Sequence, residues 1–415
     1  MKKFLFLLLL MPVAGLYAQK FEGLAKTPPM GWNSWNTFAT NISDKLVMGI
    51  ADVMVNSGMK DAGYTYLVLD DGWMAMERDP ETGNLVPDPA KFPNGLEPVI
   101  EYVHSKGLKF GLYNCAGTKT CAGYPGTRGY EYQDARWYAK MKIDFLKFDW
   151  CYAEGINAIE AYTTMSKAIK KAGRPILFSL CEWGSNEPWK WAAPVGQMWR
   201  VTGDIGNCFN GLQDHGNWSS LCVTTIVDLR KNIRQYAGPD HWNDFDMLEV
   251  GNGMAVNEDR AHFSLWCMLA APLMAGNDLR SMTPETVSIL TNKETIAIGQ
   301  DSRGVQGYLY QQIDSVDTWI KPLADNELAI CFLNRSQKPV SFTYDWKQHP
   351  VSDTVSKTNI DFNQTVYSIS DIWKNTKMMP VKNKKSKKTD QLNTAALFNA
   401  EIPAHDVILL RLKPE

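Results

Sequence analysis

The chain has 415 residues, of which 45% are hydrophobic and 21% are charged, and its formal net charge is -2. This balance provides no strongly basic surface, so neither nucleic acid nor an anionic membrane is expected as a partner. The length suits two or three domains, or an α/β barrel of about 250 residues with a smaller domain. Fifteen tryptophans and 16 tyrosines can serve large cores or the stacking of sugar rings, and both uses stay open here.

Residues 1–18 have the features of a secretory signal peptide. Two lysines precede an apolar stretch, and small residues lie near Ala18, where cleavage is expected although Leu16 is larger than the residue usually found there. The stretch is too short and wrongly flanked for a transmembrane helix, and no other segment is long enough, so no membrane span is expected. We therefore expect an exported protein, periplasmic or secreted, that begins at Gln19.

The chain contains eight cysteines, whose spacing shows no Cys-x-x-Cys pair. The six histidines are scattered, so a zinc site is not expected, and we predict neither a metal nor a cofactor. Export makes disulfides possible, but most of the cysteines are expected in the core as small hydrophobic side chains. They are Cys115, Cys121, Cys151, Cys181, Cys208, Cys222, Cys267 and Cys331.

From about residue 30 to residue 300, short apolar runs alternate with amphipathic segments. The segments 43–58, 93–107 and 154–173 have helical spacing, and Ser43 can cap the first while Gly58 can end it. This alternation predicts a (β/α)8 TIM barrel. An open doubly wound sheet is the alternative, but the glycine-rich phosphate loop that it needs is missing. The eight apolar runs are residues 29–35, 64–73, 108–115, 145–151, 176–183, 197–204, 241–247 and 271–278.

The pattern changes near residue 301, where the helical spacing is lost. Short β-rich segments separated by turn residues predict a C-terminal antiparallel β-sandwich domain. We place the barrel at residues 19–303 and the β-sandwich at residues 304–415. The basic run 374–388 in the second domain is either a solvated loop or a site for polyanions, and the solvated loop is the simpler interpretation.

Charged and hydrogen-bonding residues stand at the ends of the predicted barrel strands. These ends meet at one rim of a TIM barrel, where active sites lie. A single carboxylate there could be a helix cap or an ion-pair partner, but carboxylates or a cation at five strand ends indicate one acidic cleft. A cleft of this kind suits a glycosidase, which needs two carboxylates across the scissile bond. The residues are Asp70, Asp71, Tyr113, Lys147, Asp149, Glu182, Arg200, Asp204, Asp244 and Asp246.

Eight motifs resemble, in the same order, those of the α-galactosidase family of glycoside hydrolases (family 27). They are TPPMGWNSW, LDDGW, KTCAGYPG, LKFDWC, CEW, RVTGD, WNDFDML and APLMAGNDLR, and they cover residues 27 to about 303 densely and the C-terminal domain loosely. The resemblance implies a (β/α)8 barrel followed by an antiparallel β-sandwich, in agreement with the residue pattern. It also implies a retaining hydrolase that removes terminal α-D-galactosyl residues from oligo- or polysaccharides.

By this resemblance Asp149 is the nucleophile, and Asp204 is the general acid and base of a double displacement. Retention requires a covalent glycosyl–enzyme intermediate and carboxyl groups about 5–5.5 Å apart. Lys147 and Arg200 are expected to favour the ionised form of Asp149, as a nucleophile requires. The anionic Asp149 is in turn expected to raise the pKa of Asp204, which must begin protonated.

Further sugar contacts carry over from the family to matching positions. Trp35 is expected to form an apolar wall for the sugar. Asp70 and Asp71 are expected to accept hydrogen bonds from O4 and O6, and so to recognise the axial 4-hydroxyl of galactose. Tyr113 and Lys147 are expected to line the floor.

The family also implies contacts on the other side of the sugar. Glu182, Arg200 and Asp246 are expected near O2. Cys121 is expected near the substrate and disulfide-bonded to Cys151, which would hold the loop after the third strand beside the nucleophile.

The chain departs from the family pattern at several positions. Gly72 stands where several relatives have a cysteine. Cys181 lacks the family's partner, because Gly196 occupies that position, so a free thiol or another partner is expected. Trp150 is bulky where relatives often have a small residue, and we expect it to shape the aglycone side. Asp244 is expected to be structural.

Other functions are open on the same scaffold. A non-catalytic galactoside-binding protein would lack one of the two catalytic aspartates, and both are present. A metal-dependent hydrolase using the strand-end aspartates would need a hard cation such as calcium or magnesium. Within the family, a small residue in place of Glu182 would favour an α-N-acetylgalactosaminidase, and loss of Asp70 would favour a β-L-arabinopyranosidase. Because both residues are retained, galactose is the expected sugar.

Overall fold

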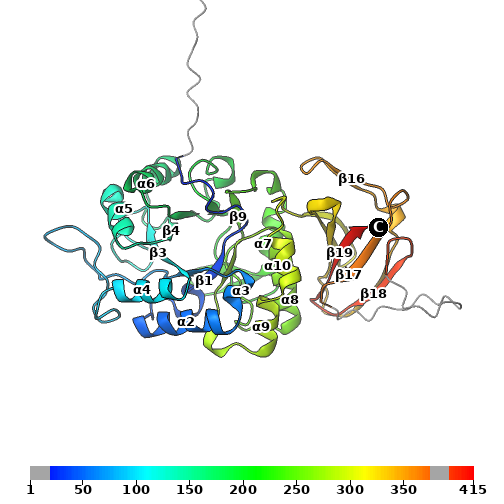
Figure 1. The fold of residues 1–415 in the computed structure, drawn as a ribbon, viewed down its shortest axis with the longest axis horizontal. Helices are drawn as coiled ribbons and strands as arrows, with labels where there is room; N and C mark the ends of the chain where they lie inside the picture. The colour runs from blue at the N-terminus through cyan, green and yellow to red at the C-terminus, as the bar shows by residue number, and fades with distance from the viewer. Residues whose placement is uncertain (1–18, 374–391) are drawn as a thin grey trace, which may run out of the picture.

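The computed structural model describes residues 19–373 and 392–415. The expected signal peptide and the whole basic run 374–388 lie outside the described residues. Figure 1 shows an α/β barrel in the N-terminal part of the chain and a smaller β-domain at the C-terminal end. The predicted architecture, a TIM barrel followed by an antiparallel β-sandwich, is confirmed. The expected boundary at residues 303 and 304 stays a prediction, and it falls between the last barrel helix and the first strand of the β-domain.

Eight parallel strands form the barrel, in the order β10-β1-β2-β3-β4-β5-β6-β9. The two ends of this sheet meet through Leu248, whose N–H donates to Met274 O at 2.7 Å and whose carbonyl accepts from Gly276 N at 3.0 Å. Each predicted apolar run contains one strand. The bounds are β1 (Met30–Asn33), β2 (Tyr66–Val68), β3 (Lys109–Cys115), β4 (Phe145–Asp149), β5 (Leu177–Cys181), β6 (Met198–Arg200), β9 (Trp242–Asp244) and β10 (Leu273–Ala275).

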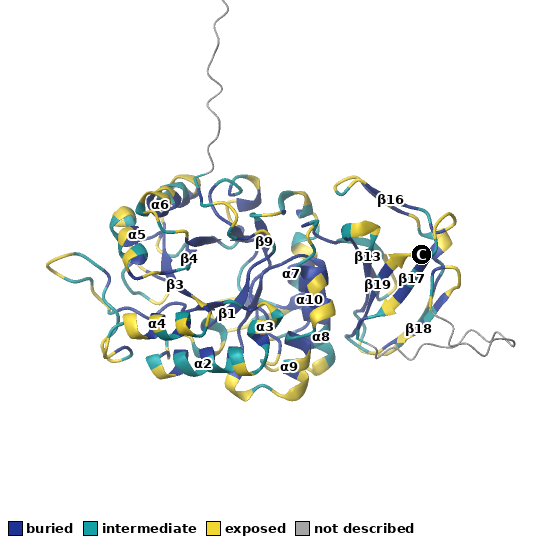
Figure 2. Cartoon of the chain, in the orientation of Figure 1, coloured by how far each residue is buried: buried dark blue, intermediate teal, exposed yellow. Residues whose placement is uncertain are grey.

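The three predicted helices are present as α2, α4 and α6. Ser43 accepts a hydrogen bond from Leu46 N at the start of α2, and Gly58 adopts φ = 83° beyond its end. Figure 2 shows the buried faces of the helices turned toward the strands. The bounds are α1 (Trp35–Phe38), α2 (Asp44–Asn56), α3 (Met59–Ala62), α4 (Glu97–Ser105), α5 (Glu131–Lys140), α6 (Ala158–Ala172), α7 (Val223–Arg230), α8 (Val256–Met268), α9 (Pro284–Leu290) and α10 (Lys293–Gly299). Short 3-10 helices are η1 (Pro188–Lys190), η2 (Arg234–Tyr236), η3 (Leu279–Ser281), η4 (Ala324–Asn326) and η5 (Trp346–Gln348).

The β-domain contains a five-stranded antiparallel sheet in the order β11-β12-β13-β19-β17, with the two-stranded sheets β14-β18 and β15-β16. Alternate residues of β12 and β13 face a separate core that is rich in aromatic side chains, among them Phe332 and Phe398, which stack at 5.8 Å. The bounds are β11 (Tyr308–Ile313), β12 (Val316–Pro322), β13 (Leu328–Asn334), β14 (Val340–Tyr344), β15 (Val351–Asp353), β16 (Thr358–Ile360), β17 (Tyr367–Asp371), β18 (Phe398–Ile402) and β19 (Val407–Pro414).

The two domains are joined by buried polar contacts. Helix α8 packs on β12, β13 and β19 of the β-domain. Arg234 forms an ion pair with Asp353 at 2.7 Å. The buried Lys321 donates from Nζ to the carbonyls of Cys267 and Ile298 at 3.0 and 2.6 Å. These contacts attach the β-domain to the side of the barrel.

The cysteines differ in part from the expectation. Five of the eight are buried in the core, as expected for most of them, and four of these five (Cys115, Cys181, Cys267 and Cys331) are free. The other four form the disulfides Cys121–Cys151 and Cys208–Cys222. The second disulfide was not predicted, because both of its cysteines lie in the irregular connection after β6, where sequence spacing carries no signal.

Among the described residues, no helix combines the length and the apolar character that crossing a bilayer requires.

Candidate active site

The strand register brings the predicted site residues to one level of the barrel. Asp149 at the end of β4 lies in register with Cys115 of β3 and with Cys181 of β5. Arg200 at the end of β6 lies in register with Asp244 of β9. Because the strands are parallel, these carboxyl ends form a single rim, as the sequence predicts for a TIM barrel.

Asp149 is deeply buried at this rim. The residue is only 5% exposed to solvent, and its Oδ1 accepts a hydrogen bond from Trp150 N at 2.8 Å. Burial raises the pKa of Asp149 to about 7, although the positive charge of Lys147 lowers it and the negative charge of Asp204 raises it further. The carboxyl group is therefore poised to gain or lose a proton near neutral pH.

Lys147 contacts a different carboxylate from the one expected. Its Nζ lies 2.8 Å from Asp70 Oδ2 and 5.3 Å from the centre of the Tyr113 ring. Asn33 Nδ2 donates to the same Asp70 oxygen at 2.8 Å. Asp149 thus receives the field of Lys147 without a direct hydrogen bond from it.

Asp71 is bound by the neighbouring loop. Its Oδ2 accepts from Ala122 N at 2.8 Å, and its Oδ1 accepts from Gly72 N at 2.8 Å. Burial raises the pKa of Asp71 to about 6, while these backbone hydrogen bonds lower it. Asp70 and Asp71, adjacent in sequence, are therefore held by two different sets of partners.

Arg200 connects two carboxylates on the opposite side of the rim. Its Nη2 lies 2.9 Å from Asp204 Oδ1 and 2.8 Å from Asp246 Oδ2. Asp246 has φ = 81°, which is uncommon for a residue with a side chain, and its N–H donates to Asp244 Oδ1 at 2.9 Å. Its Oδ2 also accepts from Ile205 N at 2.8 Å. The strained backbone is thus fixed by hydrogen bonds on both sides.

Asp204 differs from Asp149 in exposure and in charge. Its side chain is 42% exposed, so it stands at the mouth of the site. Burial by itself would raise the pKa of Asp204, but the charges of Arg200 and Lys147 and the hydrogen bond from Arg200 outweigh that effect and lower it. The pKa order expected from the sequence is the reverse, and it is wrong for this structure because Arg200 contacts Asp204 directly.

Glu182 forms no hydrogen bond with Arg200, its expected neighbour at O2. Its Oε2 accepts from Asn186 N and Nδ2 at 2.5 and 2.7 Å, while its buried Oε1 has no hydrogen-bond partner in the described part of the chain. Burial raises the pKa of Glu182 to about 7. Asn186 and Asn33, which hold Glu182 and Asp70, were missed by the sequence analysis because a single asparagine, in a loop or at the end of β1, carries no distinctive pattern.

A pocket is lined by residues on or directly after β1, β4, β5, β6, β9 and β10. It brings together three of the predicted substrate-binding residues, Lys147, Arg200 and Asp246. Trp35 packs against the same apolar cluster that supplies part of the lining. The other lining residues are Asn33, Phe145, Ser179, Met198, Asp244, Met247 and Met274. The lining combines six polar or charged residues with four apolar ones, which suits a small polar ligand.

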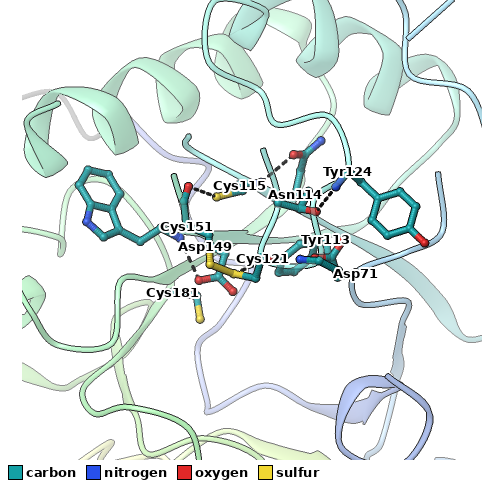
Figure 3. The surroundings of a disulfide bond; sticks show 12 residues. Asp71, Tyr113, Asn114, Cys115, Cys121, Tyr124, Asp149, Cys151 and Cys181 are labelled. Carbon is teal, nitrogen blue, oxygen red and sulfur yellow. Dashed lines mark hydrogen bonds between the residues drawn. A yellow bond between two sulfur atoms is a disulfide. The ribbon is translucent and has the colours of Figure 1, made fainter. Parts of the chain in front are cut away.

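The disulfide Cys121–Cys151 lies beside the nucleophile, as Figure 3 shows. One Asp149 carboxylate oxygen and the two sulfurs lie within 4.8 Å of one another. Tyr113 Oη donates to Cys121 Sγ at 3.2 Å. Because disulfide sulfurs are not thiolates, this group is not a set of metal ligands. The disulfide instead joins the loop after β3 to the residue two positions beyond Asp149.

The bulky residue after the nucleophile packs away from the rim. The Trp150 ring stacks on Tyr162 of α6, with centroids 5.5 Å apart and an interplanar angle of 22°. Packing against the helix layer leaves the expected role toward the aglycone to other residues.

Residues 27–301 match the family model described as "Alpha galactosidase A", and residues 314–412 match the model of the α-galactosidase C-terminal β-sandwich domain. The chain belongs to the α-galactosidase family. It is 50% identical to an α-galactosidase A of Cellvibrio japonicus over 397 residues, which cover 96% of this chain and 94% of the relative.

Solved structures of α-galactosidases share the whole fold. α-Galactosidase I of Mortierella vinacea superposes with a TM-score of 0.84 at 35% identity, covering 94% of this chain and 98% of that one. The α-galactosidase of Saccharomyces cerevisiae with raffinose superposes with a TM-score of 0.85 at 30% identity, covering 95% and 99%.

Proposed function

We propose that this member of the α-galactosidase family removes terminal non-reducing α-D-galactosyl residues from oligo- or polysaccharides with retention of configuration. The observation that carries the proposal is the pair of carboxylates at the rim, Asp149 buried and Asp204 at the mouth, each within the field of the other. Retaining glycosidases require two such groups in different environments.

In the first step an Asp149 oxygen attacks C1 of galactose, and the bond from C1 to the glycosidic oxygen breaks. Asp204 gives its proton to that oxygen, so the leaving group departs as an alcohol. In the second step water attacks C1 of the galactosyl ester, Asp204 takes a proton from the water, and Asp149 is released as a carboxylate. Two inversions at C1 give net retention.

The two carboxyl groups hold one proton between them over a broad range of pH. Because the pKa of Asp149 is raised and that of Asp204 is lowered, most singly protonated molecules carry the proton on Asp149. The reactive arrangement, with the proton on Asp204, is the minor form of the same protonation state. Catalysis then draws on this minor form, which the pH dependence of activity can reveal.

Galactose recognition is assigned to the buried charged groups around the cavity. Lys147 and Asn33 keep an Asp70 oxygen in place, and Arg200 does the same for Asp246. These carboxylates can accept hydrogen bonds from sugar hydroxyls without first changing conformation, which lowers the cost of ordering the site. We assign O4 and O6 to Asp70 and Asp71, and O2 to the side of Arg200 and Asp246.

A panel of p-nitrophenyl α-glycosides tests the proposal. We expect hydrolysis of the α-galactoside, with at most weak activity toward the α-N-acetylgalactosaminide and the β-L-arabinopyranoside. Asp149→Asn is the control and should be inactive toward all of them. Activity that persists in EDTA is expected, and its loss would favour the metal-dependent alternative. Binding of the α-galactoside without turnover would instead indicate a galactoside-binding protein.

We also propose that the protein is exported and begins at Gln19. The two disulfides support this, because such bonds persist in oxidising compartments outside the cytosol. N-terminal sequencing of protein collected outside the cytoplasm should give Gln19 first, and Met1 on that material would contradict the proposal.

A further inference from the structure

A β-hairpin follows the acid/base residue directly. It consists of β7 (Leu212–Asp214) and β8 (Ser219–Leu221) in the connection between β6 and α7. Leu221 N donates to the carbonyl of Asp204 at 2.8 Å, and Gly206 N donates to the carbonyl of Leu221 at 2.9 Å. The disulfide Cys208–Cys222 closes the base of this connection. The hairpin is therefore attached to the backbone of Asp204 itself.

An ordered tryptophan stands at the tip of this hairpin. Trp218 is 50% exposed, and its ring stacks on His215 with centroids 4.2 Å apart and an interplanar angle of 21°. His215 Nε2 and Ser220 Oγ are hydrogen-bonded at 2.9 Å, and His215 N donates to Trp218 O at 2.9 Å. These contacts fix one face of the indole, so the ring is held in place before any ligand arrives.

The direction of the ring follows from the strand pattern. Trp218 directly precedes β8 and is paired with His215 through the hydrogen bond from His215 N, so the alternation of side chains places Trp218 and Ser220 on the same side of the hairpin. Ser220 is 1% exposed, and its Oγ lies only 2.3 Å from where a Cβ on Gly206 would stand. Trp218 is therefore on the face of the hairpin that carries Ser220 and borders Gly206, two residues after Asp204. Leu212 pairs with Leu221 on the opposite side and is 63% exposed.

The catalytic chemistry determines which part of the substrate lies near the Trp218 side of the hairpin. The acid protonates the oxygen of the leaving group, so the leaving group must lie on the side of Asp204 and not on the side of Asp149. Asp204 stands at the open mouth, and the hairpin is hydrogen-bonded to its backbone, so a leaving sugar that extends outward from Asp204 starts beside the hairpin. Aromatic side chains supply large, rigid contact area at such sites.

We propose that Trp218 is a specificity-determining residue that stacks on the sugar of the leaving group in oligosaccharide substrates. This inference rests on the proposed function and adds a subsite for the aglycone. Contact with the leaving group at a distance from the reacting carbon contributes to kcat/KM for substrates that have this sugar and is absent for substrates that lack it.

The test compares raffinose, whose leaving group is a disaccharide, with α-galactosyl fluoride, whose leaving group is a single atom. Trp218→Ala should lower kcat/KM for raffinose by about tenfold, the effect expected from one aromatic contact. It should leave kcat/KM for the fluoride unchanged within about twofold. Trp218→Phe should retain most of the activity toward raffinose because a flat ring remains.

Leu212→Ala is the matched control, since it removes an exposed apolar side chain from the other face of the same hairpin. We expect it to leave both substrates unaffected. Equal losses on both substrates for Trp218→Ala, or no loss on raffinose, would overturn the inference. A wild-type enzyme that hydrolyses neither substrate would contradict the proposed function itself, which is a different result.

Discussion

The two sides of the rim handle the same kind of group in opposite ways. On the β3–β4 side, Asp149 is buried and lies next to the disulfide Cys121–Cys151. Its carboxylate has no direct contact with a cation among the described residues. On the β6–β9 side, Asp204 is half exposed and bound to Arg200. Burial raises the pKa of the first carboxyl to about 7, and the arginine lowers that of the second.

This difference shows that the burial of a carboxyl group and its pKa can point to different catalytic roles. The burial of Asp149 suits a nucleophile, whereas its raised pKa by itself would suit an acid. A deep carboxylate is shielded from solvent and can form a covalent bond to the sugar without competition from water. A carboxyl group at the mouth can exchange protons with solvent between the two steps. The direct contact with Arg200 lowers the pKa of Asp204 and so disfavours the protonated form that a general acid needs. Asp204 acts as the acid in the minor form of the pair, in which it carries the shared proton.

Removing Asp149 should have the largest effect. Asp149→Gly leaves no nucleophile, so turnover should stop. Azide can enter the space on the side opposite the leaving group and attack once, which should give the β-galactosyl azide of inverted configuration. NMR of the product identifies the anomer directly.

Removing Asp204 should affect substrates in proportion to their need for an acid. Asp204→Gly should lower the rate on raffinose by about 10²–10⁴-fold and should slow α-galactosyl fluoride far less, because fluoride needs little protonation to leave. Azide should then intercept the galactosyl–enzyme and give the α-azide. The α-azide from the Asp149 variant, or the β-azide from the Asp204 variant, would mean that the two roles are exchanged.

The pH dependence should sharpen the comparison next. With raffinose, kcat/KM should fall above about pH 7, where the proton held by the pair is lost. Asp204→Asn acting on α-galactosyl fluoride needs only ionised Asp149, so its kcat/KM should rise with pH and then stay level. The midpoint should lie below 7, because the negative charge of Asp204 is one of the causes that raise the pKa of Asp149. A decline above pH 7 that persists in this variant would contradict the shared-proton account.

The two disulfides allow a matched test of the two sides. Two variants are compared, each with both cysteines of one disulfide replaced by serine. The first removes Cys121–Cys151, which has a sequence separation of 30, and the second removes Cys208–Cys222, which has a sequence separation of 14. Each change should lower the free energy of unfolding by about 3–4 kcal/mol, measured by denaturant unfolding. The first change should lower kcat/KM for both substrates, since it loosens the nucleophile side. The second change should lower kcat/KM for raffinose more than kcat/KM for the fluoride, since it loosens the side that carries Asp204 and the hairpin. The opposite pattern would contradict the assignment of the nucleophile to one side of the rim and of the acid to the other.

The smallest expected effect is on stability. Asp149 has a pKa near 4 in the unfolded chain and about 7 in the folded one, so the folded state binds more protons between these values. Stability contributed by the protonated group is therefore lost as the pH rises through this window. Asp149→Asn cannot ionise, so it avoids the loss of stability that comes from a buried negative charge. It should be more stable than the wild type by about 1–3 kcal/mol at about pH 8, with little difference at about pH 4. Equal stability at both pH values would mean that burial does not raise the pKa of Asp149.

Much of the fold could be predicted because its signals are local. The cap at Ser43 and the glycine after α2 mark the helix within a few residues. The apolar runs identify all eight barrel strands, and six of the runs end with charged or hydrogen-bonding residues that the sequence analysis assigns to the rim. Parallel pairing brings the carboxyl ends of the strands to one rim, as the sequence predicts, while the register that sets Asp149 opposite Cys181 comes from the structure.

The partners of the site residues were not predictable in the same way. Lys147 precedes Asp149 by two residues, which suggests an ion pair, yet its ammonium group contacts Asp70, 77 residues earlier in the chain. Trp150 follows the nucleophile but stacks on a helix. The hydrogen bond from Asn33 at the end of β1 joins it to Asp70, and the bond from Asn186 depends on a loop, and the residue pattern specifies neither partner.

The sequence by itself determined the barrel, the β-sandwich, the family and the set of ionisable groups at the rim, because periodicity, caps and ordered motifs are properties of neighbouring residues. Only the tertiary structure decided which cation contacts which carboxylate, which cysteines pair after β6, and that the Trp218 ring stacks on His215. These outcomes depend on distances between segments far apart in the chain. The pKa values of Asp149 and Asp204 depend on them in turn, since burial and direct contact with Arg200 are set by packing.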